Sequence, residues 1–404
     1  NGAGVEKGAW VVFLQQPYGS FAKTMLEVQE YPELRVYPGG PLKRPYDVTA
    51  QTLGTQLGVE VYRVDAPTTL RVSRFDSTTR PSGTRSGAGQ YWLFSHQNNA
   101  FAKLANRLLR RGHRLDWATY GFRVDDLPFP VGTLMAKAGE GARDELQELL
   151  EDLPLQVHQV EKRPQLAWQR IREPGIGLYK SYAPSKDEGW TRWILEQYEF
   201  SYTTLRDRDI RAGTLQNLDV ILFANQSAKE IKEGLSEPYP QEFRGGIGQE
   251  GLASLRRFAE QGGTLVFLGD SGELPVREWD LGITEVTRDL PRSDFFVPGS
   301  LLRIRVNPRH PVGYGMRETS AAMFVRSPAF ETKAAVSIAS YAAEDLLLSG
   351  WIDGEGYLHG RQAVFEVPVA KGRIIFIGFR CQFRAQTRVT YKLLFNSLFY
   401  ATIR

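Results

Sequence analysis

One stretch in the middle of the chain constrains the fold more than any other. It begins with the apolar run Val220–Ala224, continues with an amphipathic segment over Gln249–Gln261, and ends with the apolar run Thr264–Leu268. Gly262-Gly263 closes the amphipathic segment, as glycine does at the C-termini of helices. A strand, a helix and a second strand in this order form a βαβ unit of a parallel sheet. The sequence therefore predicts an α/β fold.

Apolar periodicity elsewhere predicts two such domains. Residues 1–165 contain βα units of similar spacing and form a small α/β domain. Residues 166–174, next to Pro164 and ending at Pro174, are the expected linker. Residues 175–404 form a flavodoxin-like parallel-sheet domain, with a β-rich insertion at about 285–352 where the pattern changes to short strands. We expect a Thr-, Ser-, Arg- and Gly-rich loop over Ala66–Gln90.

The first domain contains most of the individual assignments that a structure can test. The helices expected there are Tyr18–Gln29, a short helix capped by Asp47 and ended by Gly58, Asn99–Arg111 and Ala142–Leu153. The expected strands are Ala9–Leu14, Val59–Val64, Tyr91–Ser95, Arg114–Ala118, Val131–Ala136 and Leu155–Val160.

The composition is that of an ordinary soluble globular protein, with 42% hydrophobic and 24% charged residues. The net charge is only +4, and the basic run Arg71–Arg114 carries no nucleic-acid-binding motif, so we interpret the run as a solvated face and expect no nucleic-acid partner. No apolar run reaches the roughly 18 residues that a membrane span needs. The N-terminus has neither a start methionine nor a signal-peptide core, and we expect a fragment of a longer protein.

The turn after Thr264–Leu268 decides whether the second domain is an enzyme. The order of elements around it resembles class I glutamine amidotransferases, which carry a nucleophilic cysteine at this turn and a histidine base near the C-terminus. Here the turn carries Asp270 and Ser271, and Glu273 replaces the second glycine of a G-x-S-x-G elbow. No His-x-Glu pair follows near the C-terminus. The resemblance therefore implies a degenerate domain in which Ser271 is a turn residue.

An active hydrolase or amidotransferase remains the alternative interpretation. Its nucleophile would be Ser271 or Cys381, and Arg380 and Arg384 would supply the positive charge that activates a thiol. This interpretation predicts a measurable turnover that Ser271→Ala or Cys381→Ala abolishes.

Polar residues also follow the expected parallel strands at their carboxyl ends, where α/β sheets bind ligands. Two arginines with nearby amides suit a carboxylate held in a forked geometry. The competing interpretation is that these groups satisfy one another and cap helices. The predicted small-ligand site comprises Asn225, Asp270, Ser271, Arg380, Gln382 and Arg384.

One short motif has the letters of a metal site. His158 and Glu161 match the His-x-x-Glu motif of zinc carboxypeptidases. They are expected at the end of a strand, where residues three apart point to opposite faces and do not converge on one ion. The sequence therefore predicts no metal ligands in this chain.

Three long segments carry a broader resemblance. Residues 8–61 (GAWVVFLQQPYGSF…GVEV), 298–316 (PGSLLRIRVNPRHPVGYGM) and 372–401 (GRIIFIGFRCQF…FYA) resemble the region that follows the catalytic domain in bacterial zinc carboxypeptidase-like proteins of the carboxypeptidase A type. The resemblance extends over nearly all of the 404 residues. None of the family's zinc ligands or its glutamate base maps onto this sequence.

The resemblance implies a non-catalytic accessory segment of a metallocarboxypeptidase-like protein, whose activity would be the release of C-terminal amino acids from peptides. It implies zinc only in an upstream peptidase domain and no cofactor here. The implied location is secreted or periplasmic. The implied partners are the upstream peptidase domain, a peptide or cell-surface polymer, or another copy of the chain.

Overall fold

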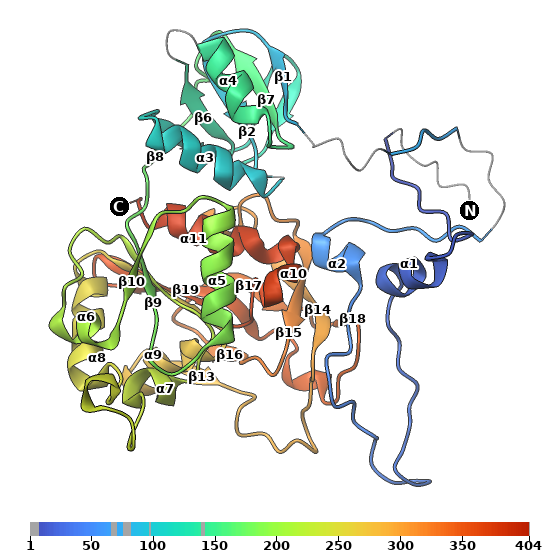
Figure 1. The fold of residues 1–404 in the computed structure, drawn as a ribbon, viewed down its shortest axis with the longest axis vertical. Coiled ribbons are helices and arrows are strands. Elements are labelled where there is room, and N and C mark those ends of the chain that lie inside the picture. The colour runs from blue at the N-terminus through green and yellow to red at the C-terminus, as the bar shows by residue number, and fades with distance from the viewer. Residues whose placement is uncertain (1–7, 66–70, 76–81, 97, 139–141, 404) are drawn as a thin grey trace.

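The computed structural model describes residues 8–65, 71–75, 82–96, 98–138 and 142–403 (Figure 1). They form a small sheet domain, a larger sheet domain and an N-terminal arm, which we define as residues 8–65. Both domains combine helices with sheets, which confirms the predicted α/β class.

The small domain is a six-stranded mixed sheet in the order β1-β7-β2-β6-β3-β8. Its helix α3 buries Phe101, Leu104, Ala105 and Leu108, which recur at helical spacing on one face. The helices are α3 (Ala100–Arg110) and α4 (Ala142–Leu150). The strands are β1 (Thr84–Gly87), β2 (Tyr91–Phe94), β3 (Leu115–Ala118), β6 (Leu134–Lys137), β7 (Gln156–Val160) and β8 (Trp168–Ile171), with a separate hairpin of β4 (Phe122–Val124) and β5 (Leu127–Phe129).

Two predicted boundaries of this domain differ from the structure. The predicted linker 166–174 contains β8, which pairs antiparallel with β3 and completes the sheet edge. The flanking prolines therefore mark the ends of an edge strand and not a flexible connection. The predicted loop Ala66–Gln90 contains β1, which pairs parallel with β7. Residues 66–70 and 76–81 of that loop lie outside the described residues.

The large domain has five parallel strands in the order β10-β9-β11-β12-β20, continued by antiparallel strands β19-β17-β14-β15. Its strands are β9 (Ile176–Tyr179), β10 (Tyr202–Leu205), β11 (Val220–Phe223), β12 (Thr264–Leu268), β13 (Ile283–Glu285), β14 (Ser300–Val306), β15 (Thr319–Phe324), β16 (Phe330–Thr332), β17 (Val336–Tyr341), β18 (Leu347–Ser349), β19 (Gln362–Val369) and β20 (Gly372–Ile377). The strands β13–β18 coincide with the predicted β-rich insertion.

Helices cover both faces of the parallel strands. Alternate residues of β11 point to opposite faces, so Leu222 joins the core under α5 and α11, whereas Phe223 joins the core under α6 and α8. The helices are α5 (Lys186–Gln197), α6 (Asp207–Ala212), α7 (Ala228–Glu233), α8 (Gly248–Glu260), α9 (Glu273–Glu278), α10 (Phe383–Gln386) and α11 (Tyr391–Tyr400). The result is a three-layer arrangement, with helices on both faces of the parallel strands.

The arm attaches to the large domain, although the sequence assigned it to the small one. The Thr49 hydroxyl donates to the Gly299 carbonyl at 2.9 Å, and the Thr52 and Ser349 hydroxyls lie 2.8 Å apart. The backbone N–H of Gln29 donates to the Ser349 hydroxyl at 2.9 Å. These contacts fix the middle of the arm beside β14 and β18 (Figure 1).

The helices of the arm are shorter than predicted and its strands do not form. The arm contains α1 (Gly19–Leu26) and α2 (Leu53–Leu57). Helix α2 ends at Gly58 as predicted, but it starts six residues after Asp47, whose carboxylate binds the N–H of Val48 instead. In the described structure, neither Ala9–Leu14 nor Val59–Val64 is a strand. Apolar alternation favours a strand only where another strand is available to pair.

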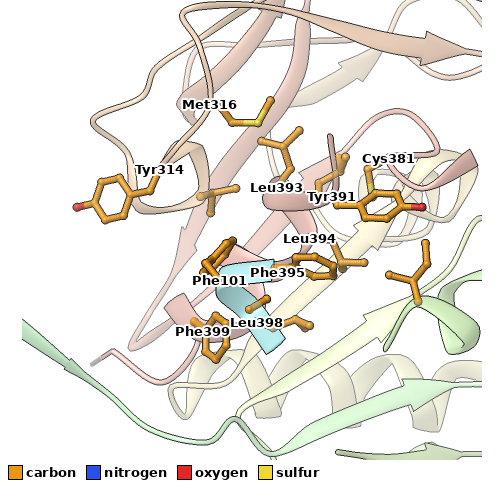
Figure 2. Close-up of a cluster of buried hydrophobic side chains, with 14 of the residues drawn as sticks. Phe101, Tyr314, Met316, Cys381, Tyr391, Leu393, Leu394, Phe395, Leu398 and Phe399 are labelled. Atoms are coloured by element: carbon orange, nitrogen blue, oxygen red, sulfur yellow. The ribbon is translucent and has the colours of Figure 1, made fainter. Parts of the chain in front are cut away.

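A shared core joins the two domains. Figure 2 shows Phe101 of α3 among the side chains of α11. The Phe101 and Phe399 rings are 6.4 Å apart between centroids, and the Phe200 ring lies 5.3 Å from Phe399. Phe101 and Phe399 are fully buried, so the domains pack as a continuous hydrophobic core.

Ion pairs extend the same interface at the surface. Arg107 of α3 binds Glu199 at 2.8 Å and Asp152 at 2.6 Å, and Arg110 binds Glu199 at 2.5 Å. The hydrogen bonds from Arg107 hold the pKa of Asp152 well below its usual range. Acidic partners therefore compensate Arg107 and Arg110, two members of the basic run Arg71–Arg114.

Candidate functional site

The site is built on a sharp turn after β12. Gly269 has φ +58°, a left-handed conformation that suits glycine. A Cβ on this residue would stand 2.1 Å from Oδ1 of Asn225, so the turn also requires a residue without a side chain. The chain continues through a 3₁₀ turn over Gly269–Gly272 into α9. The predicted strand–turn–helix corner is therefore present.

Asn225 connects this turn to the neighbouring strand end. It follows β11, and its Oδ1 accepts a hydrogen bond from the backbone N–H of Asp270 at 2.9 Å. Its Nδ2 donates to Oδ2 of Asp187 at 3.2 Å. Because both ends of the amide are engaged, Asn225 positions the turn against α5.

Asp187 contacts Asn225, Arg380 and Gln382, and we call these four residues together with Asp270 the polar cluster. Asp187 was not among the site residues predicted from the sequence. Its Oδ2 also accepts a hydrogen bond from Nε of Arg380 at 3.0 Å, and its backbone carbonyl accepts one from Nε2 of Gln382 at 3.3 Å. Asp187 lies in the first turn of α5, whose N-cap Ser185 accepts from the N–H of Glu188 at 3.2 Å. The letters S-x-x-E at 185–188 were the available signal, because a helix that starts here places Asp187 at the strand ends.

The remaining charges of the corner are also paired. Arg288 donates to Oδ1 of Asp270 at 3.1 Å and forms a close ion pair with the buried Glu273. Glu273 also pairs with Arg277 at 2.8 Å. Arg380 donates from its Nη1 to the Val325 carbonyl at 2.8 Å, in addition to its bond with Asp187. A carboxylate ligand would therefore have to displace an existing partner of each cation.

Arg384 is separate from this cluster. It is exposed, has φ +50°, and its guanidinium stacks 5.1 Å from the centre of the Phe383 ring. The structure thus brings Asn225, Asp270, Arg380 and Gln382 together around Asp187. The forked pair of arginines that the sequence suggested does not form among the described contacts.

Ser271 lies beneath the corner, with no exposed surface. Its hydroxyl donates to the backbone carbonyls of Leu268 at 2.9 Å and Phe223 at 3.3 Å. A nucleophilic serine must instead give its proton to a base and direct its oxygen at a substrate carbonyl. In this conformation Ser271 stabilises the turn.

Cys381 is equally inaccessible. It has no exposed surface, and burial raises the pKa of its thiol to about 12. A thiol must be deprotonated to act as a nucleophile, so this environment opposes reactivity. Its backbone carbonyl accepts hydrogen bonds from the Thr387 and Thr390 hydroxyls at 3.0 and 2.5 Å, which explains the conformation of the segment that follows β20.

The histidines do not provide a base for either candidate nucleophile, Ser271 or Cys381. His113 binds Glu145 at 2.9 Å, His310 lies 3.3 Å from Glu366, and His359 lies 3.9 Å from Glu355. His158 lies within β7 as predicted, and its Nδ1 is 2.7 Å from the Ser86 hydroxyl. The fifth, His96, is buried among aromatic rings of the domain interface.

Within the described ranges, no three His, Cys, Asp or Glu side chains gather as the ligands of a metal ion would. None of the described helices combines the length and apolar character that a membrane crossing requires.

Comparisons with known proteins identify no family. No protein-family model matches the chain, and no curated protein matches it. Among solved structures, it is similar to the cytoplasmic protein STM3548 from Salmonella typhimurium, with 13% identity, a TM-score of 0.38, and coverage of 57% of this chain and 100% of that one. A ThuA-like protein from Bacteroides uniformis gives 11% identity, a TM-score of 0.34, and coverage of 59% and 95%.

A β-galactosidase from Bacillus circulans sp. alkalophilus gives 13% identity and a TM-score of 0.33 over 56% of this chain. The chain spans 31% of the length of that enzyme. Similarity at this level assigns neither a family nor an activity. None of these three proteins is described as a carboxypeptidase, and the resemblance to that family stays a prediction.

Proposed function

We propose that this chain is a non-catalytic accessory segment of a larger, exported zinc metallocarboxypeptidase-like protein. One observation carries the non-catalytic part of the proposal. Both side chains that could attack a substrate, Ser271 and Cys381, are fully buried, and the Ser271 hydroxyl is bonded to two backbone carbonyls. The sequence resemblance alone supports the parentage.

The polar cluster around Asp187 fits an accessory role as a structural tie. It links the ends of β11, β12 and β20 to the start of α5 through paired charges and amides. Pairing of this kind rigidifies a strand-end corner that an amidotransferase would use for chemistry. The chain would then contribute packing, polymer binding or self-association to its parent, and zinc chemistry would belong to the upstream domain.

A turnover assay tests the proposal. The purified chain, Ser271→Ala and Cys381→Ala are assayed with glutamine, activated esters and peptides that carry a free C-terminus. We expect all three proteins to show the same rate as buffer, because no nucleophile is available. A turnover in the unmodified chain that either substitution abolishes would overturn the proposal in favour of the hydrolase or amidotransferase alternative.

A further inference from the structure

The arm carries far more exposed apolar surface than the rest of the molecule. Of the 28 exposed large hydrophobic residues in the described part of the chain, 18 lie in residues 8–65, and only eight lie beyond residue 82. Trp10 is 74% exposed, Tyr18 75% and Phe21 65%. Scattered apolar residues on a surface are ordinary, but a concentration of this kind marks an interaction surface.

The exposed area is large enough for a stable complex. Eight aromatic residues of the arm, Trp10, Phe13, Tyr18, Phe21, Tyr31, Tyr37, Tyr46 and Tyr62, are between 43% and 94% exposed. At about 150–250 Å² for each fully covered ring, they alone offer about 800–1,350 Å². A standard specific interface buries about 800 Å² on each partner. The aromatic residues of the arm therefore expose an apolar area of this size even without its aliphatic residues.

The arm also contains a recess. A groove of about 470 Å³ lies between the arm and the segment around β18, and Val28, Tyr31, Leu42, Leu347 and Trp351 line it. The apolar run Trp10–Leu14 and this groove belong to the same chain, and Trp10 packs in the structure against Phe75, which is itself 56% exposed. The chain thus presents both an exposed apolar run and a recess.

We propose that the arm joins two copies of this chain into a two-fold symmetric dimer, with the apolar run Trp10–Leu14 of each copy seated in the groove of the other. A reciprocal exchange of this kind closes after two subunits, which is the commonest symmetry of soluble oligomers. Charge does not oppose it, because residues 8–65 contain five Lys and Arg against six Asp and Glu. The body offers no comparable apolar concentration among the described residues, so the contact is made with the arm of the other copy and the groove beside it.

The arm is held in position for this contact. Hydrogen bonds from Gln29, Thr49 and Thr52 fix the middle of the arm to the large domain, and Gln29 itself lines the groove, so the groove is held in place before the partner binds. A preorganised surface loses less conformational entropy on association than a disordered tail does. The dimer does not depend on the accessory role: a dimer that also turned over a substrate would contradict that role alone.

Light scattering on a sizing column tests the dimer. The unmodified chain is expected to have twice the 45.6 kDa mass of one chain at micromolar concentration. The double variant Trp10→Glu and Phe13→Glu buries two charges in the interface and is expected to weaken the dimer by about 100-fold or more, giving a monomer. Leu347→Arg places a long charged side chain in the groove from the large domain, and this variant is also expected to be a monomer.

The control is Tyr120→Glu, which changes a 70% exposed aromatic residue outside the arm and is expected to remain dimeric. Far-UV circular dichroism verifies that every variant is folded. A monomeric unmodified chain, or a dimer that persists in both the arm and the groove variants, would overturn the proposal.

Discussion

Replacing His96 with leucine is expected to make the free energy of unfolding decrease less as the pH falls from 7 to 4. His96 is buried against Phe101 and Trp117, with ring centroids 4.0 and 5.4 Å away. Burial, reinforced by the positive charge of Lys392, lowers its pKa from 6.5 to about 3. Between these two pH values, the unfolded chain therefore binds a proton at His96 that the folded protein does not bind.

The sign of the effect follows from this difference. Between about pH 6.5 and 3 the unfolded state binds more protons, so the free energy of unfolding decreases as the pH falls, by about 1.4 kcal/mol per pH unit from this one residue. Above pH 6.5 both states are neutral at His96 and the residue has no effect on the pH dependence. Below about pH 3 both states are protonated and the loss stops growing.

Urea unfolding near pH 7 and near pH 4 measures the effect. The unmodified chain is expected to lose about 3 kcal/mol more stability between these conditions than His96→Leu loses. The matched control is His359→Leu, because His359 is on the surface with its side chain 37% exposed. An unchanged difference between pH 7 and pH 4 in His96→Leu would show that the histidine is not buried as described.

Truncating Phe101 to alanine is expected to destabilise both domains together. Phe101 is fully buried between α3 and α11, and its ring is 6.4 Å from that of Phe399. Phe→Ala substitutions at such positions cost about 3–5 kcal/mol, because they remove apolar contacts and leave a cavity. Since the two domains share this core, we expect one unfolding transition that shifts as a whole.

Denaturant unfolding followed by tryptophan fluorescence and by circular dichroism provides the measurement. Tyr120→Ala is the control, and its exposed position in the same domain predicts a change within about 0.5 kcal/mol. Two separate transitions in the unmodified chain, or a Phe101→Ala variant as stable as the control, would contradict a shared core.

Much of the large domain was predictable because its signals are local. The runs that form β11 and β12 are apolar apart from Thr264, as expected of strands buried on both faces, and Gly262-Gly263 ends α8 where predicted. The small domain followed the same rules for β2, α3, β3 and β7. In each of these elements the local sequence pattern was sufficient to predict the structure.

The errors arose where a distant partner decides the structure. Val59–Val64 alternates like a strand, but the described structure provides no neighbouring strand. Trp168–Ile171 lies between prolines like a linker, yet it pairs with β3. Asp47 could have capped a helix, but the contacts of Thr49 and Thr52 with the large domain delay its start to Leu53.

In the candidate site, too, the local features were predictable from the sequence and the long-range contacts were not. The corner and the residues that follow the strands were visible in the sequence, because the carboxyl ends of parallel strands meet at one edge. The partners that neutralise them were not, since Arg288 reaches Asp270 from beyond β13 and Asp187 reaches Arg380 across 193 residues. Pairing, which decides between a ligand site and a structural tie, depends on these long-range contacts.

The central claim, that this strand-end corner has no available nucleophile, is tested most directly by covalent labelling of the native protein. The folded chain is treated with a serine-reactive fluorophosphonate and with iodoacetamide, and its intact mass is measured. Ser271 and Cys381 are fully buried, and burial keeps the Cys381 thiol protonated. We therefore predict an unchanged mass in the native state and a single iodoacetamide adduct after unfolding. An adduct on Ser271 or Cys381 in the native protein would contradict the account.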